Sequence, residues 1–448
     1  MRTQLRRSSI ALIAIVALSA SLTGCQTAKV GARCRTTSFA QQGDWVLICR
    51  SGHWQHYMTK ARGLAYLYAL SHPATTTTAA PATTTTTTTT APPPVATFAS
   101  VDAGYSHTCA VMNTGAVHCW GSNGGGELGN GTTTDSSTPV TVSGITSATS
   151  VSAGNESSCA VLADHTVRCW GYNAHGQLGN GTTTNSSSPV AVTGISTATG
   201  VSVGQEHACA VLANHSVTCW GWNSAGELGN NSTSDSWTPV AVTGLSTATA
   251  VAAGDSQSCA LLSTNDVKCW GWNSSGQLGN GTTSQSSTPV SVGGGVAANA
   301  AQLSIGVTFG CVALTGGTGS CWGDGGNGRL GNNTTTNAST PVGVQGLLNV
   351  DTVSAGGGVA CATAGGAGWC WGNNFNGQLG DNTTTSHSTP VHVNGLSSVV
   401  SITVGSSHVC ALVTGGDVEC WGVNTYGQLG NGSTTESHTA VTVTRVLP

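Results

Sequence analysis

Residues 170–179 read WGYNAHGQLG, and close variants of this string recur along the chain. The seven copies begin at Trp120, Trp170, Trp220, Trp270, Trp322, Trp371 and Trp421. Each copy also has a cysteine about one strand before its tryptophan. These cysteines are Cys109, Cys159, Cys209, Cys259, Cys311, Cys361 and Cys410, in steps of 50, 50, 50, 52, 50 and 49 residues. A period near fifty residues with glycine-rich turns is typical of solenoids and propellers.

Each copy holds four short strand patterns separated by turns. In the second copy they cover residues 149–153, 158–162, 167–171 and 189–192. Four strands per repeat match one propeller blade. The composition agrees, because 63 of 448 residues are glycine and only 7% are charged, whereas long helices are rich in Ala, Glu, Lys, Leu and Arg. We therefore predict an all-β fold, with a seven-bladed propeller over residues 96–448.

The repeated string, preceded by Ala-Gly and by a Cys-Ala-Val or Cys-Ala-Leu strand, resembles the regulator of chromosome condensation repeat. The copies depart from the pattern locally, with Gly325 in place of Asn in the fifth and Ala440 in place of Pro in the seventh. The resemblance implies a seven-bladed propeller whose ring is sealed by pairing strands from both chain ends. We expect residues 95–101 and 441–447 to be the sealing segments.

The first 25 residues have the pattern of an export signal. Arg2, Arg6 and Arg7 precede an apolar run at residues 10–18 that is short for a membrane span. Residues 22–25 read LTGC and resemble a bacterial lipobox, in which Cys25 would be lipidated and become the first mature residue. The alternative is an ordinary Cys25 beyond a simple cleavage site. We predict an extracytoplasmic protein that is lipid-anchored to the bacterial cell envelope.

Two further segments precede the propeller. Residues 26–72 form a small basic unit with Cys34 and Cys49, for which we predict a disulfide-closed hairpin. Its Lys and Arg residues could contact anionic lipid or a cell-wall polymer, although a solvated basic face near a membrane anchor is the commoner explanation. Residues 73–95 are almost entirely Thr, Ala and Pro and predict an extended tether.

The charge of the propeller region argues against nucleic-acid binding. Residues 101–448 contain four Lys or Arg and sixteen Asp or Glu, which gives a net charge of −12. Phosphate backbones are bound by basic surfaces that release counterions. The family's founding activity, nucleotide exchange on a nuclear GTPase, also requires a cytosolic partner that an exported protein would not meet.

Every copy has a second cysteine nine or ten residues after the first, at Cys119, Cys169, Cys219, Cys269, Cys321, Cys370 and Cys420. A hairpin centred near Thr114 would place Cys109 opposite Cys119, at a separation that suits a disulfide. Seven cross-strand disulfides follow for an exported protein. The alternatives are free buried thiols or metal ligands. The total of 17 cysteines is odd, which is resolved if Cys25 carries lipid.

No set of residues predicts a catalytic centre, a metal site or a cofactor. The Ser106-His107 pair falls at a turn that varies between copies, so no fixed nucleophile and base are being assembled. His107, His207 and His408 share one repeat position, where packing is the simpler role. Three carboxylates, Glu156, Glu206 and Asp255, would lie along one rim. These carboxylates could bind calcium, act as an acid/base pair, or form a solvated acidic surface.

Blade-to-blade differences indicate where a ligand would bind. Tyr172, Trp222 and Trp272 share the position two residues after the repeated tryptophan, and Trp237 replaces a more usual Ser. Such rings suit stacking on sugars or anchoring a protein, unless they pack between neighbouring loops. We predict an envelope-anchored module that binds an extracytoplasmic protein or glycan. The alternatives are a polysaccharide-acting enzyme that uses the acidic rim, or a passive scaffold.

Overall fold

The structure is a computed structural model that describes residues 39–42, 45–50, 53–59, 96–296 and 298–445. The chain divides into two compact units, residues 1–92 and 93–448. In the first unit β1 (Phe39–Gln42), β2 (Trp45–Arg50) and β3 (His53–Thr59) form one antiparallel sheet. The predicted lipidation of Cys25, the predicted disulfide of Cys34 and the predicted tether lie outside the described residues.

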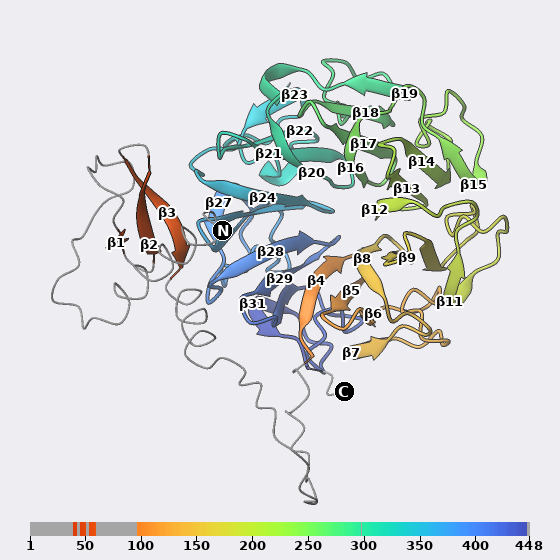
Figure 1. Ribbon diagram of the computed structural model, residues 1–448, viewed down its shortest axis with the longest axis horizontal. Coiled ribbons are helices and arrows are strands. Elements are labelled where there is room, and N and C mark those ends of the chain that lie inside the picture. Colours follow the sequence, from red (N-terminus) through yellow and green to blue (C-terminus); the bar gives the residue numbers. More distant parts are fainter. Residues whose placement is uncertain (1–38, 43–44, 51–52, 60–95, 297, 446–448) are drawn as a thin grey trace, which may run out of the picture. The chain divides into compact units, whose positions relative to one another are not determined.

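The second unit is a ring of seven four-stranded antiparallel sheets, each with its strands in sequence order (Figure 1). Blade 1 comprises β4 (Phe98–Ala103), β5 (His107–Met112), β6 (Val117–Gly121) and β7 (Ser136–Thr141). Blade 2 comprises β8 (Ala148–Ala153), β9 (Ser157–Leu162), β10 (Val167–Gly171) and β11 (Ser186–Ala191). Blade 3 comprises β12 (Ala198–Val203), β13 (His207–Leu212), β14 (Val217–Gly221) and β15 (Ser236–Ala241).

The remaining blades repeat this arrangement. Blade 4 comprises β16 (Ala248–Ala253), β17 (Gln257–Leu262), β18 (Val267–Gly271) and β19 (Ser286–Ser291), followed by the 3₁₀ helix η1 (Gly294–Val296). Blade 5 comprises β20 (Ala300–Ile305), β21 (Phe309–Leu314), β22 (Gly319–Gly323), η2 (Gly326–Gly328) and β23 (Ala338–Gly343). Blade 6 comprises β24 (Val350–Ala355), β25 (Val359–Ala364), β26 (Ala367–Gly372) and β27 (His387–His392). Blade 7 comprises β28 (Val399–Val404), β29 (His408–Val413), β30 (Val418–Gly422) and β31 (Ser437–Thr442).

This architecture confirms the predicted seven-bladed propeller, and β8 to β11 overlap the four strands predicted for the second copy. The first strands of neighbouring blades contact one another, so they line the axis of the ring. No helix among the described residues has both the length and the apolar character needed to cross a membrane.

The ring is closed differently from our expectation. We predicted that strands from both chain ends pair in one sheet, and this prediction was wrong. β4 to β7 all come from the first copy and β28 to β31 all come from the last. Phe98 N donates a hydrogen bond to Gly416 O at 3.0 Å, as Ala148 N does to Gly115 O between blades 1 and 2. The first and last blades therefore meet as any two neighbours do, with β4 beside β28 and β29 (Figure 1).

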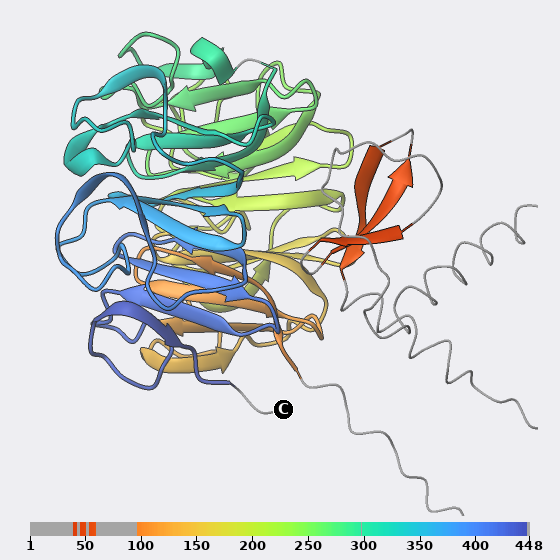
Figure 2. The ribbon, with the colours of Figure 1, turned by 90° about the vertical axis from the view of Figure 1, so that its left-hand side faces the viewer.

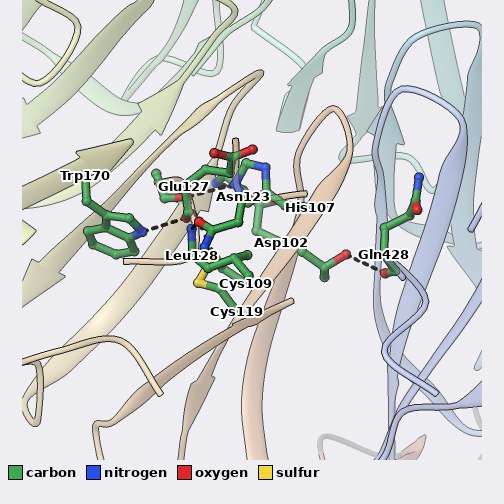
Figure 3. Close-up of a disulfide and its surroundings, with 12 residues drawn as sticks. Asp102, His107, Cys109, Cys119, Asn123, Glu127, Leu128, Trp170 and Gln428 are labelled. Carbon is green, nitrogen blue, oxygen red and sulfur yellow. Dashed lines mark hydrogen bonds between the residues drawn. A yellow bond between two sulfur atoms is a disulfide. The ribbon is translucent and has the colours of Figure 1, made fainter. Parts of the chain in front are cut away.

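The repeated tryptophan joins each blade to the preceding one. All seven indole rings are fully buried. Each indole Nε1–H donates to a backbone carbonyl of the preceding blade at 2.7–3.0 Å, and Trp120 closes the ring through Gln428 O. Figure 3 shows the bond from Trp170 to Glu127 O. A Cβ at Gly129 would lie 2.7 Å from Trp170 Nε1, which explains the glycine of the repeated string.

The asparagine of the repeated string fastens the long loop that follows the third strand. In blade 2, Asn173 Nδ2 donates to the carbonyls of Thr182 and Thr184 at 3.0 and 2.9 Å, and Asn173 Oδ1 accepts from Leu178 N. Blade 5 has Gly325 instead. There the loop forms η2, and Arg329 makes an ion pair with Asp324 at 3.0 Å.

Seven glycines surround the axis, at Gly104, Gly154, Gly204, Gly254, Gly306, Gly356 and Gly405. A Cβ on any of them would come within 2.1–2.4 Å of the carbonyl oxygen of the corresponding glycine in the next blade. The next residue reinforces the ring at several junctions; for example, Tyr105 N donates to Gly154 O at 2.8 Å. At the axis these glycines line a cavity of only about 90 Å³.

His107, His207 and His408 are buried at blade junctions. His107 Nε2 lies 2.8 Å from Ser158 Oγ, whose hydroxyl donates to Glu127 O, so the imidazole is the donor in this pair. The same arrangement links His207 to Ser258 at 2.8 Å and His408 to Thr108 at 2.9 Å. Burial lowers the pKa of His107 and His207 to about 4 and that of His408 to about 3. These histidines are neutral structural groups.

All seven predicted cross-strand disulfides of the propeller are present, which confirms that prediction. The paired Cα atoms are 4.0–4.1 Å apart, and Cys109 faces Cys119 across β5 and β6. In blade 6 the shorter spacing is absorbed by a tight turn, in which Gly365 and Gly366 both have positive φ.

The disulfides predict the outcome of thiol counting. When the full chain is unfolded without reductant and treated with a thiol-specific alkylating reagent, mass spectrometry should find the fourteen propeller cysteines unmodified. After reduction all fourteen should react. Stoichiometric labelling of either member of any pair before reduction would contradict the assignment.

Candidate functional site

Two sets of loops share one face of the propeller. Because neighbouring strands are antiparallel, the loop after the first strand of a blade emerges beside the loop after its third strand. Hydrogen bonds join them: Tyr172 N donates to Glu156 O at 2.8 Å and Trp222 N to Glu206 O at 2.9 Å. The predicted aromatic position and the predicted acidic rim are therefore adjacent. Figure 2 shows the propeller from its edge, with long loops of the blue blades extending to the left.

A cavity of about 380 Å³ opens on this face between blades 3 and 4. Trp222 and Trp272 line it, together with the carboxylates of Glu206, Asp255 and Glu227. Val307 and Thr308 of blade 5 contribute further lining, and none of the lining residues is Lys, Arg or His. The structure thus brings two of the four predicted ligand-binding aromatics together with two of the three predicted rim carboxylates.

Glu227 is the residue of this cavity that the sequence reasoning missed. Its side chain is only 1% exposed. Its Oε2 accepts a hydrogen bond from Ala225 N at 2.9 Å, while its buried Oε1 has no hydrogen-bond partner. The sequence contains only a weak indication of its role, because this repeat position also holds a glutamate in blade 1 and is otherwise mostly Gln. The corresponding residues of the other blades are Glu127, Gln177, Gln277, Arg329, Gln378 and Gln428.

The equivalent glutamate in blade 1 shows why Glu227 lacks a partner. There Ser122 Oγ donates to Glu127 Oε1 at 2.9 Å. Blade 3 has Trp222 at the position of Ser122, and the indole donates instead to Ser224 Oγ at 2.6 Å. The replacement of Ser by Trp removes the hydroxyl donor and adds an aromatic wall beside the carboxylate.

The cavity disfavours negative charge. The pKa of Glu227 is raised to about 7, mainly by burial and additionally by the negative charge of Asp235. The pKa of Asp255 is also raised, mainly by burial and additionally by the charge of Glu206. Because desolvation penalises the charged form of a carboxyl group, a group that donates hydrogen bonds or carries positive charge would stabilise these carboxylates.

His175, from the loop of blade 2, supports one side of the cavity. Its Nε2 lies 3.6 Å from Glu206 Oε2, and its Nδ1 lies 3.2 Å from Asp235 Oδ2. The imidazole also meets the Trp222 ring edge-on, with the ring centroids 4.2 Å apart. These contacts hold Trp222 and Glu206 in place.

The other two predicted aromatics lie outside the cavity lining. Trp237, on β15, is 51% exposed and packs over the blade 2 loop, where a Cβ at Gly176 would lie 2.6 Å from Trp237 Cδ1. Tyr172 is half-buried and lies against Gly125 of blade 1. The Trp237 ring thus packs against the loop of the preceding blade, and the backbone and Cβ of Tyr172 lie beside the loop of blade 1.

The third rim carboxylate, Glu156, is exposed and does not line the cavity. Within the described ranges, no group of three or more His, Cys, Asp or Glu is arranged to hold a metal ion. A second cavity of about 350 Å³ on the same face contains Arg329 and shares Gln205, Asp255 and Val307 with the first.

Fold and site together define a seven-bladed β-propeller with a cavity among the loops of one face. The profile described as Regulator of chromosome condensation (RCC1) repeat matches residues 114–161, 164–211, 214–261, 266–313, 321–363 and 366–412. A second profile of the same repeat matches residues 98–127, 148–177, 198–227, 248–277 and 399–428. These matches span more than half of the chain, which therefore belongs to the RCC1 repeat family.

Solved structures of the same fold resemble the chain at low sequence identity. Human WBSCR16 is 24% identical, with 74% of this chain and 95% of that chain covered and a TM-score of 0.67. Yeast RCC1 (Prp20) bound to Kap60 is 17% identical, with 78% and 85% covered and a TM-score of 0.65. Prp20p from Saccharomyces cerevisiae, described with its binding to Gsp1p and histones, is 18% identical, with 78% and 88% covered and a TM-score of 0.64. These likenesses show the fold. No curated protein matches the sequence.

The buried carboxylate predicts a pH-dependent gain of stability in Glu227→Gln. Because the folded-state pKa is about 7 against 4.5 for a free Glu, the penalty for burying the charge is absent below pH 4.5 and complete above about pH 7. Urea unfolding should show the variant more stable than the parent by on the order of 1–3 kcal/mol at about pH 8.5, and equally stable at about pH 4.

Glu127→Gln is the matched control, since Ser122 already satisfies that carboxylate. It should give a smaller gain at high pH. An equal effect of Glu227→Gln at both pH values would contradict the assignment of a buried, unpartnered carboxylate.

Proposed function

We propose that the protein is an exported, lipid-anchored propeller that binds an extracytoplasmic protein or glycan at the face carrying the cavity of blades 3 and 4. The observation that carries the proposal is the pair Trp222 and Trp272 beside a buried carboxylate with a free acceptor. Rigid aromatic rings and unsatisfied polar groups in a concave site are the features by which binding surfaces anchor a partner.

The lipobox-like residues 22–25 and the apolar run before them support export and lipidation of Cys25. The seven disulfides of the propeller support the same conclusion, because such bonds persist in oxidising compartments outside the cytosol. That Prp20p of the same fold is described as binding Gsp1p and histones supports a role in protein recognition. For this chain the partner belongs to the cell envelope.

We propose a binding module in place of an enzyme. Glu206, Asp255 and Glu227 contribute acceptors to the cavity, and no histidine lines it to act as a base. A polysaccharide-acting enzyme that used the acidic rim would release product from a polymer and would lose that turnover in Glu206→Gln. The binding module has no turnover to lose.

The proposal predicts which aromatics matter for partner capture. Capture of envelope proteins by the immobilised full chain, and its binding to a glycan array, should weaken at least about tenfold in Trp222→Ser and Trp272→Ser. Serine is the residue that blade 1 carries at this position, Ser122, so both variants should fold.

Tyr172→Ser is the control, because Tyr172 occupies the same repeat position but lies outside the cavity lining. It should retain capture, as should Trp237→Ser. Equal capture by all four variants would show that the cavity is not the binding site.

A further inference from the structure

The unpartnered oxygen of Glu227 restricts the chemistry of a ligand for this cavity. Within the described part of the chain, Glu227 is the only carboxylate with a buried oxygen that has no hydrogen-bond partner. A buried acceptor without a donor costs free energy, and a charged donor restores more of it than a neutral donor does. Glu227 lines a cavity to which two further acidic residues, Glu206 and Asp255, also contribute.

The aromatic walls favour the same kind of ligand. Trp222 and Trp272 are lining residues from successive blades. The faces of indole rings attract cations through the ring quadrupole, and the attraction is larger for Trp than for Tyr or Phe. No Lys or Arg lines the cavity to neutralise its carboxylates.

We infer that this cavity binds an alkylammonium group, namely the side chain of a lysine on the partner protein. The inference rests on the proposed function and specifies its ligand. The ammonium would donate to Glu227 Oε1, lie between the two indole rings and compensate the charges of Glu206 and Asp255.

Other ligands fit these observations less well. A guanidinium group binds a carboxylate best through two parallel hydrogen bonds, but Oε2 of Glu227 already accepts from Ala225 N, which leaves that oxygen less acceptor capacity than Oε1. A compact ammonium has three donors that can go to separate acceptors. A neutral sugar would leave the carboxylates without a counter-charge, and the described carboxylates are not grouped to hold a metal ion.

The titration of Glu227 gives the site a recognisable pH dependence. Because burial raises its pKa to about 7, the carboxyl group is largely neutral below that pH and loses its charge attraction for the ammonium. Affinity should therefore rise as the pH increases through about 7. The other titratable groups around Glu227 are Asp235, Glu206 and Asp255, with His175 against Glu206 and Asp235.

The direct test is titration of the full chain with Nα-acetyl-lysine methylamide, followed by calorimetry and tryptophan fluorescence. The same compound acetylated on Nε is the neutral control. The charged probe should bind at least about tenfold more tightly than the neutral one, and Glu227→Gln should reduce its affinity by about tenfold or more. Trp222→Ser should weaken binding as well, because it removes one ring and supplies a hydroxyl for Glu227 Oε1.

Glu127→Gln is the matched control, since it changes the corresponding carboxylate of blade 1 and should leave the affinity unchanged. The expected stability of Glu227→Gln separates lost binding from misfolding. Equal binding of the charged and neutral probes would overturn the inference, as would full affinity in Glu227→Gln or an affinity that does not change between about pH 5.5 and 8.

Competition separates this inference from the proposed function. If the lysine probe displaces the captured protein and Glu227→Gln loses capture, both stand. If Trp222→Ser loses capture while Glu227→Gln retains it and the probe does not compete, the binding face is correct and the ammonium site is wrong. Capture of a neutral glycan alone at this cavity would likewise overturn the lysine inference. If no cavity variant alters capture, the proposed function fails.

Discussion

The buried hydrogen bond from each repeated indole to the backbone of the preceding blade is the interaction on which the rest of the structure depends. It occurs at all seven junctions, including the one between Trp120 and Gln428 that joins the two ends of the propeller. The carbonyl of Glu227 accepts such a bond from Trp270 at 2.7 Å, while its side chain lines the cavity. The backbone of this residue is therefore fixed by the fold, and its side chain is free to differ between blades and to serve recognition.

Disulfides stabilise the individual blades, and noncovalent contacts stabilise the junctions between them. The disulfide of each blade joins its second and third strands, so it stabilises the blade itself and not its junctions. Closing a loop of about ten residues contributes at most roughly 2.7 kcal/mol by the chain-entropy model. The junctions depend on noncovalent contacts: the indole bond, the pairs such as His107 with Ser158, and the close approach of the axial glycines. Because these contacts repeat, the ring closes without strand exchange between its ends.

The sequence predicted the features that recur in every copy. It did not predict the strand at which each blade begins or the positions of individual side chains. The fifty-residue period and the cysteine spacing were sufficient for the blades and their disulfides. A period alone does not show at which strand a blade begins, so the predicted sealing by both chain ends was wrong. Among the aromatics, only the structure separates Trp222 and Trp272 from Tyr172 and Trp237. Glu227 was missed because it replaces a common Gln, and its free oxygen depends on Trp222 occupying the place of a serine hydroxyl.

The closing junction provides the most direct test of this account. Trp120→Phe and Trp170→Phe remove the same indole donor from matched carbonyls, since Gln428 O also accepts from Thr108 and Glu127 O from Ser158. With the disulfides intact, urea unfolding should show that both variants lose a similar amount of stability, on the order of 1–3 kcal/mol. A normal stability of Trp120→Phe together with a destabilised Trp170→Phe would show that the two ends of the propeller are not joined as the other blades are.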